Sequence, residues 1–212
     1  MRNCWLCGGL NLNYLETEKA GYYFCQDCEL IFLKKEAIVS REEEKARYEE
    51  HDNSHDNIGY VTMFEKFIEK VIIPNDHGIN SVLDFGCGPV PVLADLLKER
   101  GYKVDIYDPF FFPKKNYDNQ SYDLITSTEV FEHLHNPVGE IKKLYSCLGK
   151  GGFLAIMTSF HPGPEKFVDW WYKWDPTHVV FYNSITFDYI ANMFSFEKVL
   201  DDGEKYCLLQ KK

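Results

Sequence analysis

The sequence predicts an α/β protein, a three-layer sandwich with a mostly parallel sheet, preceded by a small module that a metal ion organises. Between residues 58 and 210, strand-like apolar runs alternate with segments of helical apolar spacing, the pattern of a parallel sheet covered by helices. Residues 1–33 are instead rich in Cys, Gly and aromatic residues and have no helical period. We therefore divide the chain into an N-terminal module (1–33), a charged linker or solvated helix (34–57) and a main domain (58–212).

Composition and charge narrow the class of protein. A chain of 212 residues with 45% hydrophobic residues can form one well-packed domain plus a small appendage. The formal net charge of −10 disfavours broad contact with nucleic-acid phosphates, although it does not exclude RNA. No apolar run reaches the roughly 18 residues of a membrane span, and MRNCWLCGG has no signal-peptide core. We expect a cytoplasmic protein with no membrane contact and no evident protein partner.

The main domain begins with a helix over residues 58–73, because apolar side chains recur there at helical spacing and Pro74 closes the pattern. The alternation then continues to the end of the chain. In order, the expected elements are a strand at 81–85, a helix at 90–100, strands at 103–107 and 122–127, a helix at about 129–147, a strand at 152–157, a helix at 185–194 with Ser184 as N-cap, and strands at 196–200 and 205–210.

The N-terminal module contains two CxxC pairs. Cys4 and Cys7 form the first, Cys25 and Cys28 the second, and 17 residues separate them. This spacing is typical of a zinc ribbon with four thiolate ligands, whereas redox pairs or unrelated cysteine turns rarely come twice at this distance. A closed four-sulfur shell leaves no open position, so the zinc is expected to be structural. The other cysteines are not expected to act as nucleophiles: Cys87, Cys147 and Cys207.

A glycine turn follows the first strand of the main domain, in SVLDFGCGPVPVLADLLKERGYKVDIYDP. Gly86 and Gly88 permit a sharp turn and close approach of a ligand to the backbone. A dinucleotide-binding turn needs a third small residue where this chain has Pro91, and Asp84 would repel a pyrophosphate. The turn therefore favours a cofactor that carries positive charge.

Three segments together resemble class I S-adenosylmethionine-dependent methyltransferases: VLDFGCGPVPVLADLL, YDLITSTEVFEHL and LGKGGFLAIMTS. The resemblance extends over about residues 58–210 and implies a Rossmann-like fold that binds S-adenosylmethionine (SAM). It implies that the glycine turn packs against the methionine and ribose, Asp84 lies near the ammonium group and Asp108 accepts from the ribose hydroxyls. On this resemblance, the expected cofactor-binding residues are Asp84, Phe85, Gly86, Cys87, Gly88, Asp108, Pro109, Phe110, Thr128 and Glu129.

The resemblance weakens after Asp108, which could also simply form an Asp-Pro turn. Only about a dozen residues (109–121) separate the second and fourth strands of the family pattern, so the third strand and its helix must be shortened or lost. The acidic residue that often binds the adenine amino group has no clear counterpart. Adenine packing then falls to Phe110 or Phe111.

Potential ligands of a second metal ion follow the fourth strand. In TSTEVFEHLHNP, Glu129, Glu132 and His133 stand at i, i+3 and i+4, so on a helix they share one face. His178 comes later, in WYKWDPTHVVFYNSITF. This set resembles the small-RNA terminal 2′-O-methyltransferases, which implies a divalent ion, Mg²⁺ or similar, bound by all four residues. The alternative, as in the quinone-biosynthesis O-methyltransferases that this region also resembles, is that the Glu-His pair only braces the loop.

Without a second ion, His178 or His133 is the candidate catalytic base, because histidine titrates near neutral pH. An insertion at about 160–182 is unusually aromatic, and its rings either form the core of a lid or line an acceptor pocket. Those rings are Trp170, Trp171, Tyr172, Trp174, Phe181 and Tyr182.

Our interpretation is a SAM-dependent methyltransferase whose acceptor is the hydroxyl group of a small molecule. The acidic balance and the aromatic insertion favour a small acceptor. The alternatives are a metal-dependent RNA 2′-O-methyltransferase, a sugar C-methyltransferase and a binding module of the same fold without catalysis. Retention of the acidic residues and glycines of the turn argues against the last of these.

Overall fold

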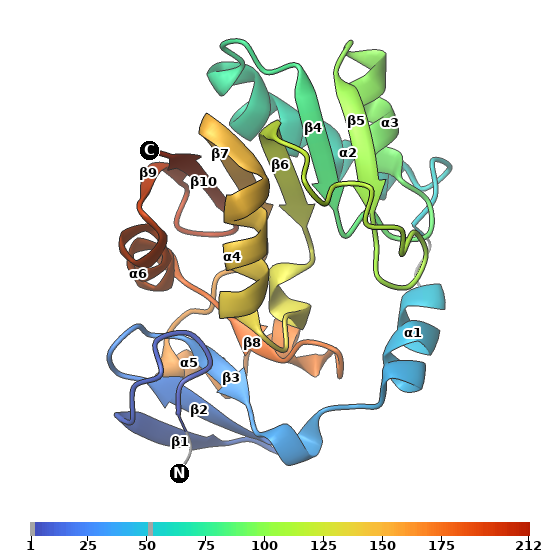
Figure 1. The fold of residues 1–212 in the computed structure, drawn as a ribbon. Coiled ribbons are helices and arrows are strands. Elements are labelled where there is room, and N and C mark those ends of the chain that lie inside the picture. The colour runs from blue at the N-terminus through green and yellow to red at the C-terminus, as the bar shows by residue number, and fades with distance from the viewer. Residues whose placement is uncertain (1–2, 51–52) are drawn as a thin grey trace.

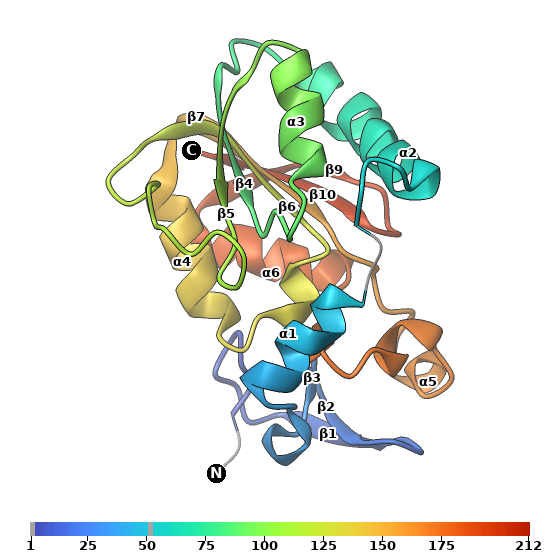
Figure 2. The same ribbon diagram turned by 90° about the vertical axis from the view of Figure 1, so that its right-hand side faces the viewer.

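The structure, a computed structural model, describes residues 3–50 and 53–212. Its centre is a six-stranded sheet with helices on both faces (Figures 1 and 2). The sheet strands are β4 (Ser81–Phe85), β5 (Lys103–Tyr107), β6 (Tyr122–Thr128), β7 (Leu148–Met157), β9 (Phe196–Asp201) and β10 (Tyr206–Lys211), in the order β5-β4-β6-β7-β10-β9. Strands β5, β4, β6 and β7 run parallel, and β10 is antiparallel to both β7 and β9.

Strand β4 lies at the centre of the parallel part and is buried on both faces. Val82 and Leu83 are fully buried, as expected for the continuous apolar run of a central parallel strand. Phe85 is paired with Tyr107 at the end of β5. The glycine turn and Asp108 therefore leave the sheet side by side, at the carboxyl edge where ligands bind in open α/β sheets.

Helices α2 and α3 cover one face of the sheet, and α4 and α6 cover the other (Figure 2). Their bounds are α2 (Ile58–Phe67), α3 (Val92–Glu99), α4 (Pro137–Cys147) and α6 (Ser184–Phe194). Only the first part of the helix predicted at 58–73 is therefore α-helical. A π-helical turn, Ile68–Ile72, and a 3-10 turn, Ile73–Asn75, continue it. No described helix combines the length and apolarity needed to cross a bilayer.

The N-terminal module forms a second, four-stranded antiparallel sheet (Figure 1). Its strands are β1 (Leu12–Glu16), β2 (Gly21–Cys25), β3 (Ile31–Leu33) and β8 (Val180–Phe181). Strand β8 comes from the aromatic insertion and pairs Phe181 with Ile31. Buried side chains of the module and of the α4 and α6 face also form one continuous cluster. The module is therefore joined to the main domain by a shared sheet and a shared core.

The charged linker contains helix α1 (Arg41–Glu49), which begins with a capping box between Ser40 and Glu43. The aromatic insertion contains two short helical elements, α5 (Pro164–Phe167) and a 3-10 turn at Trp171–Trp174.

The segment between β5 and β6 contains no strand that extends the central sheet, in the part of the chain that the structure describes, so the shortened connection is as expected. The Tyr117 ring is buried there, edge-on to Tyr107 at a centroid distance of 4.8 Å and to Phe85 at 6.2 Å. One aromatic side chain from a loop thus covers the apolar edge that a helix and strand would otherwise cover.

Several predicted boundaries are wrong, among them the helix at 90–100, which is Val92–Glu99, and the following three. No single helix runs over 129–147: a 3-10 turn, Phe131–His133, follows β6, and α4 begins only at Pro137, behind the N-cap Asn136. Asn183 rather than Ser184 caps α6, since its side chain accepts from the Thr186 N–H. Strand β7 begins at 148, four residues before the predicted start.

Candidate active site

The glycine turn is shaped by the backbone of β5 and by one neighbouring side chain. Gly86 (φ 84°) and Gly88 (φ 68°) both adopt left-handed backbone conformations. The N–H groups of Gly86 and Cys87 donate to the Tyr107 carbonyl at 2.7 and 3.2 Å. A Cβ on Gly86 would lie 2.2 Å from a methyl group of Val130, whereas a Cβ on Gly88 would meet no atom within 4 Å. Gly86 is thus required for packing, and Gly88 borders open space.

Asp84, two residues before the turn, is 1% exposed. The Thr126 hydroxyl donates to its Oδ1 at 2.9 Å, but Oδ2 has no hydrogen-bond partner. Burial raises the pKa of Asp84 to about 7, despite the bond from Thr126. A buried carboxylate oxygen without a donor is costly, so this position would be stabilised by a bound cation.

Asp108 follows β5 and organises the neighbouring backbone. Its Oδ2 accepts from the Gly88 N–H at 3.1 Å, and its Oδ1 accepts from the N–H groups of Phe110 and Phe111 at 2.8 and 3.1 Å. The Asp-Pro turn expected as an alternative and a ligand-facing carboxylate are therefore compatible, because Oδ2 can still accept a second hydrogen bond, whereas Oδ1 already accepts two.

A cavity of about 950 Å³ opens beside the turn. Its volume lies at the upper end of the range for small-molecule sites. The expected ligand residues that line it are Phe85, Gly86, Gly88, Asp108, Pro109, Phe110, Thr128, Glu129, Glu132, His133 and His178. Asp84 and Cys87 are not among the lining residues, and both are buried. The aromatic insertion lines the same cavity through Trp170, Trp171 and Tyr172.

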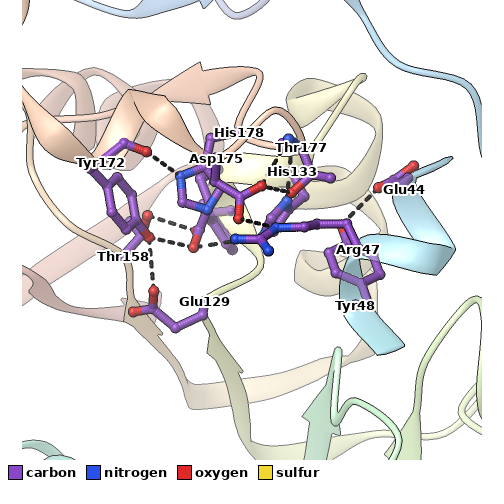
Figure 3. Close-up of polar contacts among 12 residues, drawn as sticks. Glu44, Arg47, Tyr48, Glu129, His133, Thr158, Tyr172, Asp175, Thr177 and His178 are labelled. Atoms are coloured by element: carbon purple, nitrogen blue, oxygen red, sulfur yellow. Dashed lines mark hydrogen bonds and ion pairs between the residues drawn. The ribbon is translucent and has the colours of Figure 1, made fainter. Parts of the chain in front are cut away.

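Two carboxyl groups and a phenol meet at one side of this cavity (Figure 3). The Tyr172 hydroxyl lies 2.9 Å from Glu129 Oε2 and 2.5 Å from Glu132 Oε1, and the Thr158 hydroxyl donates to Glu132 Oε2 at 2.7 Å. The phenol has one proton, so both of its contacts are hydrogen bonds only when one carboxyl is protonated. Burial, with the charge of Glu132 adding, raises the pKa of Glu129 to about 8, and burial also raises the pKa of Glu132, so the extra proton belongs to the pair of carboxyl groups.

Glu129 has φ 54°, a left-handed conformation that is unusual for a residue other than glycine. It directly follows β6, and its N–H donates to the Met157 carbonyl at 2.8 Å. The strain turns the chain sharply after the strand, so Glu129 and Glu132 reach Tyr172 from a turn rather than from one face of a helix.

His133 and His178 present the same nitrogen to a common point. Nδ1 of His133 donates to the Thr177 carbonyl at 3.0 Å, and Nδ1 of His178 donates to the Tyr172 carbonyl at 2.6 Å. A carbonyl can only accept, so in both neutral rings the lone pair is on Nε2. Among the described residues, the ligand atoms of Glu132, His133 and His178 lie within 4.8 Å of one another, and Glu129 is not part of this group. The arrangement can hold a metal ion with three of the four expected ligands.

Helix α1, which carries Glu44, Arg47 and Tyr48 (Figure 3), lines the cavity through Glu44 and Tyr48. Nε of Arg47 donates to Asp175 Oδ2 at 3.0 Å, and the Tyr48 ring stands edge-on to His133 at a centroid distance of 5.2 Å. The linker therefore contributes residues to the site. Sequence reasoning missed Tyr48, Thr158 and the role of Tyr172, because nothing in their local spacing marks them.

The second candidate metal centre is in the N-terminal module. The four sulfur atoms of Cys4, Cys7, Cys25 and Cys28 lie within 4.8 Å of one another, with two Sγ–Sγ distances of 3.5 Å. Backbone N–H groups of Leu6 and Gly9 donate to Cys4 and Cys7. Tetrahedral zinc with Zn–S bonds of about 2.3 Å places its sulfurs about 3.8 Å apart, so the four thiols fit that ion.

A Rossmann-like sheet with a glycine turn, an acidic residue after the second strand and a cavity at the carboxyl edge defines a class of cofactor-binding α/β domains. The chain belongs to a methyltransferase-domain family, whose profile matches residues 37–200. No curated protein matches the chain.

Solved structures share the fold. An O-methyltransferase family protein from Burkholderia thailandensis is 12% identical with a TM-score of 0.56, over 80% of this chain but only 63% of that one. Magnesium protoporphyrin IX methyltransferase from Synechocystis is 12% identical with a TM-score of 0.56, over 84% of this chain and 98% of that one. A SAM-dependent methyltransferase from Archaeoglobus fulgidus is 16% identical with a TM-score of 0.53, over 72% and 94% of the two chains. At these identities the likeness shows the fold alone.

Proposed function

We propose that the protein is a SAM-dependent methyltransferase that methylates a hydroxyl group of a small molecule. The observation that carries the proposal is one cavity, of about 950 Å³, that is lined both by the glycine turn and by the Glu132, His133 and His178 group. Membership of a methyltransferase-domain family supports the reaction class. Solved relatives of the fold include one whose structure contains S-adenosylhomocysteine (SAH).

The residues present fit the cofactor. Oδ2 of Asp84 is buried without a donor, and this unmet need suits the ammonium group of SAM, directly or through water. Gly88 borders the cavity with open space where a Cβ would stand, so the methionine and ribose can approach its backbone. Asp108 retains one lone pair, on Oδ2, for a ribose hydroxyl. Phe110 lines the cavity and offers a ring for the adenine.

When bound, SAM supplies an electrophilic methyl group on a positively charged sulfur. The chain's own residues must then orient the acceptor hydroxyl and take its proton. Nε2 of His178 or His133 can accept that proton, because each ring is held as the Nδ1–H tautomer by a backbone carbonyl. The half-buried Trp170 and the buried Tyr172 line this side of the cavity and would limit the access of water to it.

A specific observation favours a second version, in which a divalent ion lies between Glu132, His133 and His178. Such an ion would supply positive charge beside the acceptor hydroxyl. Two imidazoles and one carboxylate suit Mn²⁺, Fe²⁺ or Zn²⁺ better than Mg²⁺, which prefers oxygen ligands. This version supports the alternative of a metal-dependent RNA 2′-O-methyltransferase. We further propose that the four cysteines bind one structural zinc ion.

Titration calorimetry with SAH tests the cofactor site. Gly88→Ala should weaken SAH binding at least tenfold, because the added Cβ enters the cavity. Gly151→Ala is the matched control: Gly151 has φ 76° and open surroundings like Gly88, but lies at the far end of β7, so its backbone strain is similar and SAH affinity should not change. Absence of SAH and SAM binding to the wild-type protein at millimolar concentration would exclude both versions.

The acceptor class is tested by transfer of a labelled methyl group into a small-molecule extract and into an RNA pool. We expect label in the small-molecule fraction, and label in RNA would overturn this acceptor class. The metal content of the purified protein separates the two versions. A chelator is not used, because it would also remove zinc from the cysteines. A content of one zinc ion per chain supports the first version, in which a histidine acts as the base without a second metal ion. A second ion that is lost in His178→Ala supports the metal-dependent version.

A further inference from the structure

A second cavity, of about 350 Å³, lies between the N-terminal module and the aromatic insertion. We call it the lysine cavity. The residues that line it include Lys19, Tyr22 and Leu33 of the module and Lys173, Trp174 and His178 of the insertion. His178 and Asp175 line both this cavity and the larger one, so the two cavities share a wall. The two cavities are thus neighbours on either side of these residues.

Lys173 is a buried cation with few partners. The residue is 4% exposed, and its ammonium group donates one hydrogen bond, to the Trp170 carbonyl at 3.2 Å. An ammonium group has three donors. Asp169 and Glu18 act on Lys173 through their charge, but neither forms an ion pair with it among the residues that the structure describes. Burying an ammonium in this state is unfavourable, and an anion in the cavity would relieve the cost.

Lys19 brings a second positive charge to the same place. Its ammonium group lies 4.6 Å from the centre of the Trp174 ring, and that of Lys173 lies 4.1 Å from it. The two ammonium groups are therefore within about 9 Å of each other on a common indole. Cation–π contact stabilises each lysine but neutralises neither charge. Two cations are thus held together in a chain whose formal net charge is −10.

We propose that the lysine cavity binds an anionic group of the acceptor, a phosphate or a carboxylate, while the acceptor hydroxyl lies on the other side of His178. The anion would accept from the remaining donors of Lys173 and from Lys19, and would remove the repulsion between them. The proposal rests on the proposed function, because it names a feature of the substrate at that site. It makes the acceptor a small hydroxyl compound that also carries an acidic group.

Binding of simple anions to the full-length protein tests the proposal. The probes are phenyl phosphate and benzoate, with phenol as the neutral counterpart, and the readouts are tryptophan fluorescence and calorimetry. We expect saturable binding of at least one anion and much weaker binding of phenol. Lys173→Met should weaken anion binding about tenfold, since it removes the buried charge-assisted donor. Lys19→Met should weaken it several-fold.

Two variants control for charge and folding. Lys35→Met removes an exposed lysine of the 3-10 turn Lys35–Ala37, which follows β3; Lys35 does not line the cavity, so anion affinity should not change. Lys173→Arg keeps the charge and should keep anion binding. Equal affinity of the wild-type protein and Lys173→Met, or equal binding of phenol and the anions, would overturn the proposal.

SAH titrated into the same variants separates this inference from the proposed function. SAH binding with no anion binding would refute the anion site in the lysine cavity and leave the methyltransferase proposal intact. Anion binding that depends on Lys173, in a protein that does not bind SAH, would support the anion site and sink the methyltransferase proposal. The anion that binds more tightly, phosphate or carboxylate, assigns the acidic group of the acceptor.

Discussion

Replacing Asp84 with Asn should stabilise the ligand-free protein above neutral pH and weaken binding of SAM. The Asp84 carboxyl group is fully buried, and burial raises its pKa from 3.8 to about 7. The folded protein thus holds a proton that the unfolded chain releases at lower pH. The contribution of this group to the free energy of unfolding is fully present below about pH 4. It falls as the pH rises towards 7 and stays low above pH 7.

The size of this loss follows from the pKa change. A rise of about three units at ~1.36 kcal/mol per unit gives an upper limit of ~4 kcal/mol at pH 8. Asparagine never ionises, and its Oδ1 can still accept the hydrogen bond that the Thr126 hydroxyl donates to Asp84. We therefore expect Asp84→Asn to gain about 2–4 kcal/mol at pH 8 and almost nothing at pH 4.

Urea unfolding of the wild-type protein and Asp84→Asn at each pH, without cofactor, measures the difference. Asp123→Asn is the control with the opposite sign: burial opposes ionisation, but hydrogen bonds from the N–H groups of Ser81 and Asn80 lower the pKa of Asp123, so its loss should destabilise. Wild-type SAM binding should weaken up to tenfold per pH unit below 7, and binding to Asp84→Asn should be weaker and independent of pH. An Asp84→Asn protein that is no more stable at pH 8 than wild type would refute the reasoning.

Three further predictions concern other parts of the chain. Burial lowers the pKa of His161 to about 4, so lowering the pH from 6.5 to 4 should cost about 3 kcal/mol of unfolding free energy, and His161→Gln should remove this pH dependence in urea titrations. Cys25→Ser should abolish stoichiometric zinc in metal analysis and lower the melting temperature. Arg47→Met should change stability by less than about 1 kcal/mol, because the Arg47–Asp175 pair is partly exposed, but should speed hydrogen exchange in α1.

The strands that carry the glycine turn and Asp108 could be predicted from sequence. Residues 81–85 and 103–107 match β4 and β5 without error, because each is a short apolar run bounded by turn residues. The glycine turn follows from the same local pattern. Its shape depends mainly on neighbours in the chain and on the adjacent strand, so little information from distant residues is needed.

The side of the cavity that carries Glu129 and Glu132 could not be predicted in the same way. The pattern EVFEHL reads as helical, yet Asn136 and Pro137 carry the real helix start, and Glu129 adopts a strained φ of 54°. What fixes Glu129 and Glu132 is the hydroxyl of Tyr172, some 40 residues later. A contact at that separation leaves no trace in local periodicity.

The same long-range assembly links the N-terminal module to the candidate site. The Leu33 N–H donates to the Val179 carbonyl at 2.8 Å, and the Val179 N–H donates to the Glu132 carbonyl at 2.8 Å. The residue next to His178 is therefore held by the module on one side and by the site on the other. On the proposal that zinc organises the module, loss of the metal should loosen His178 through β3 and leave the glycine turn, which β4 and β5 position, in place. Cys25→Ser should then weaken acceptor binding more than SAH binding, whereas an equal loss of both would indicate global unfolding.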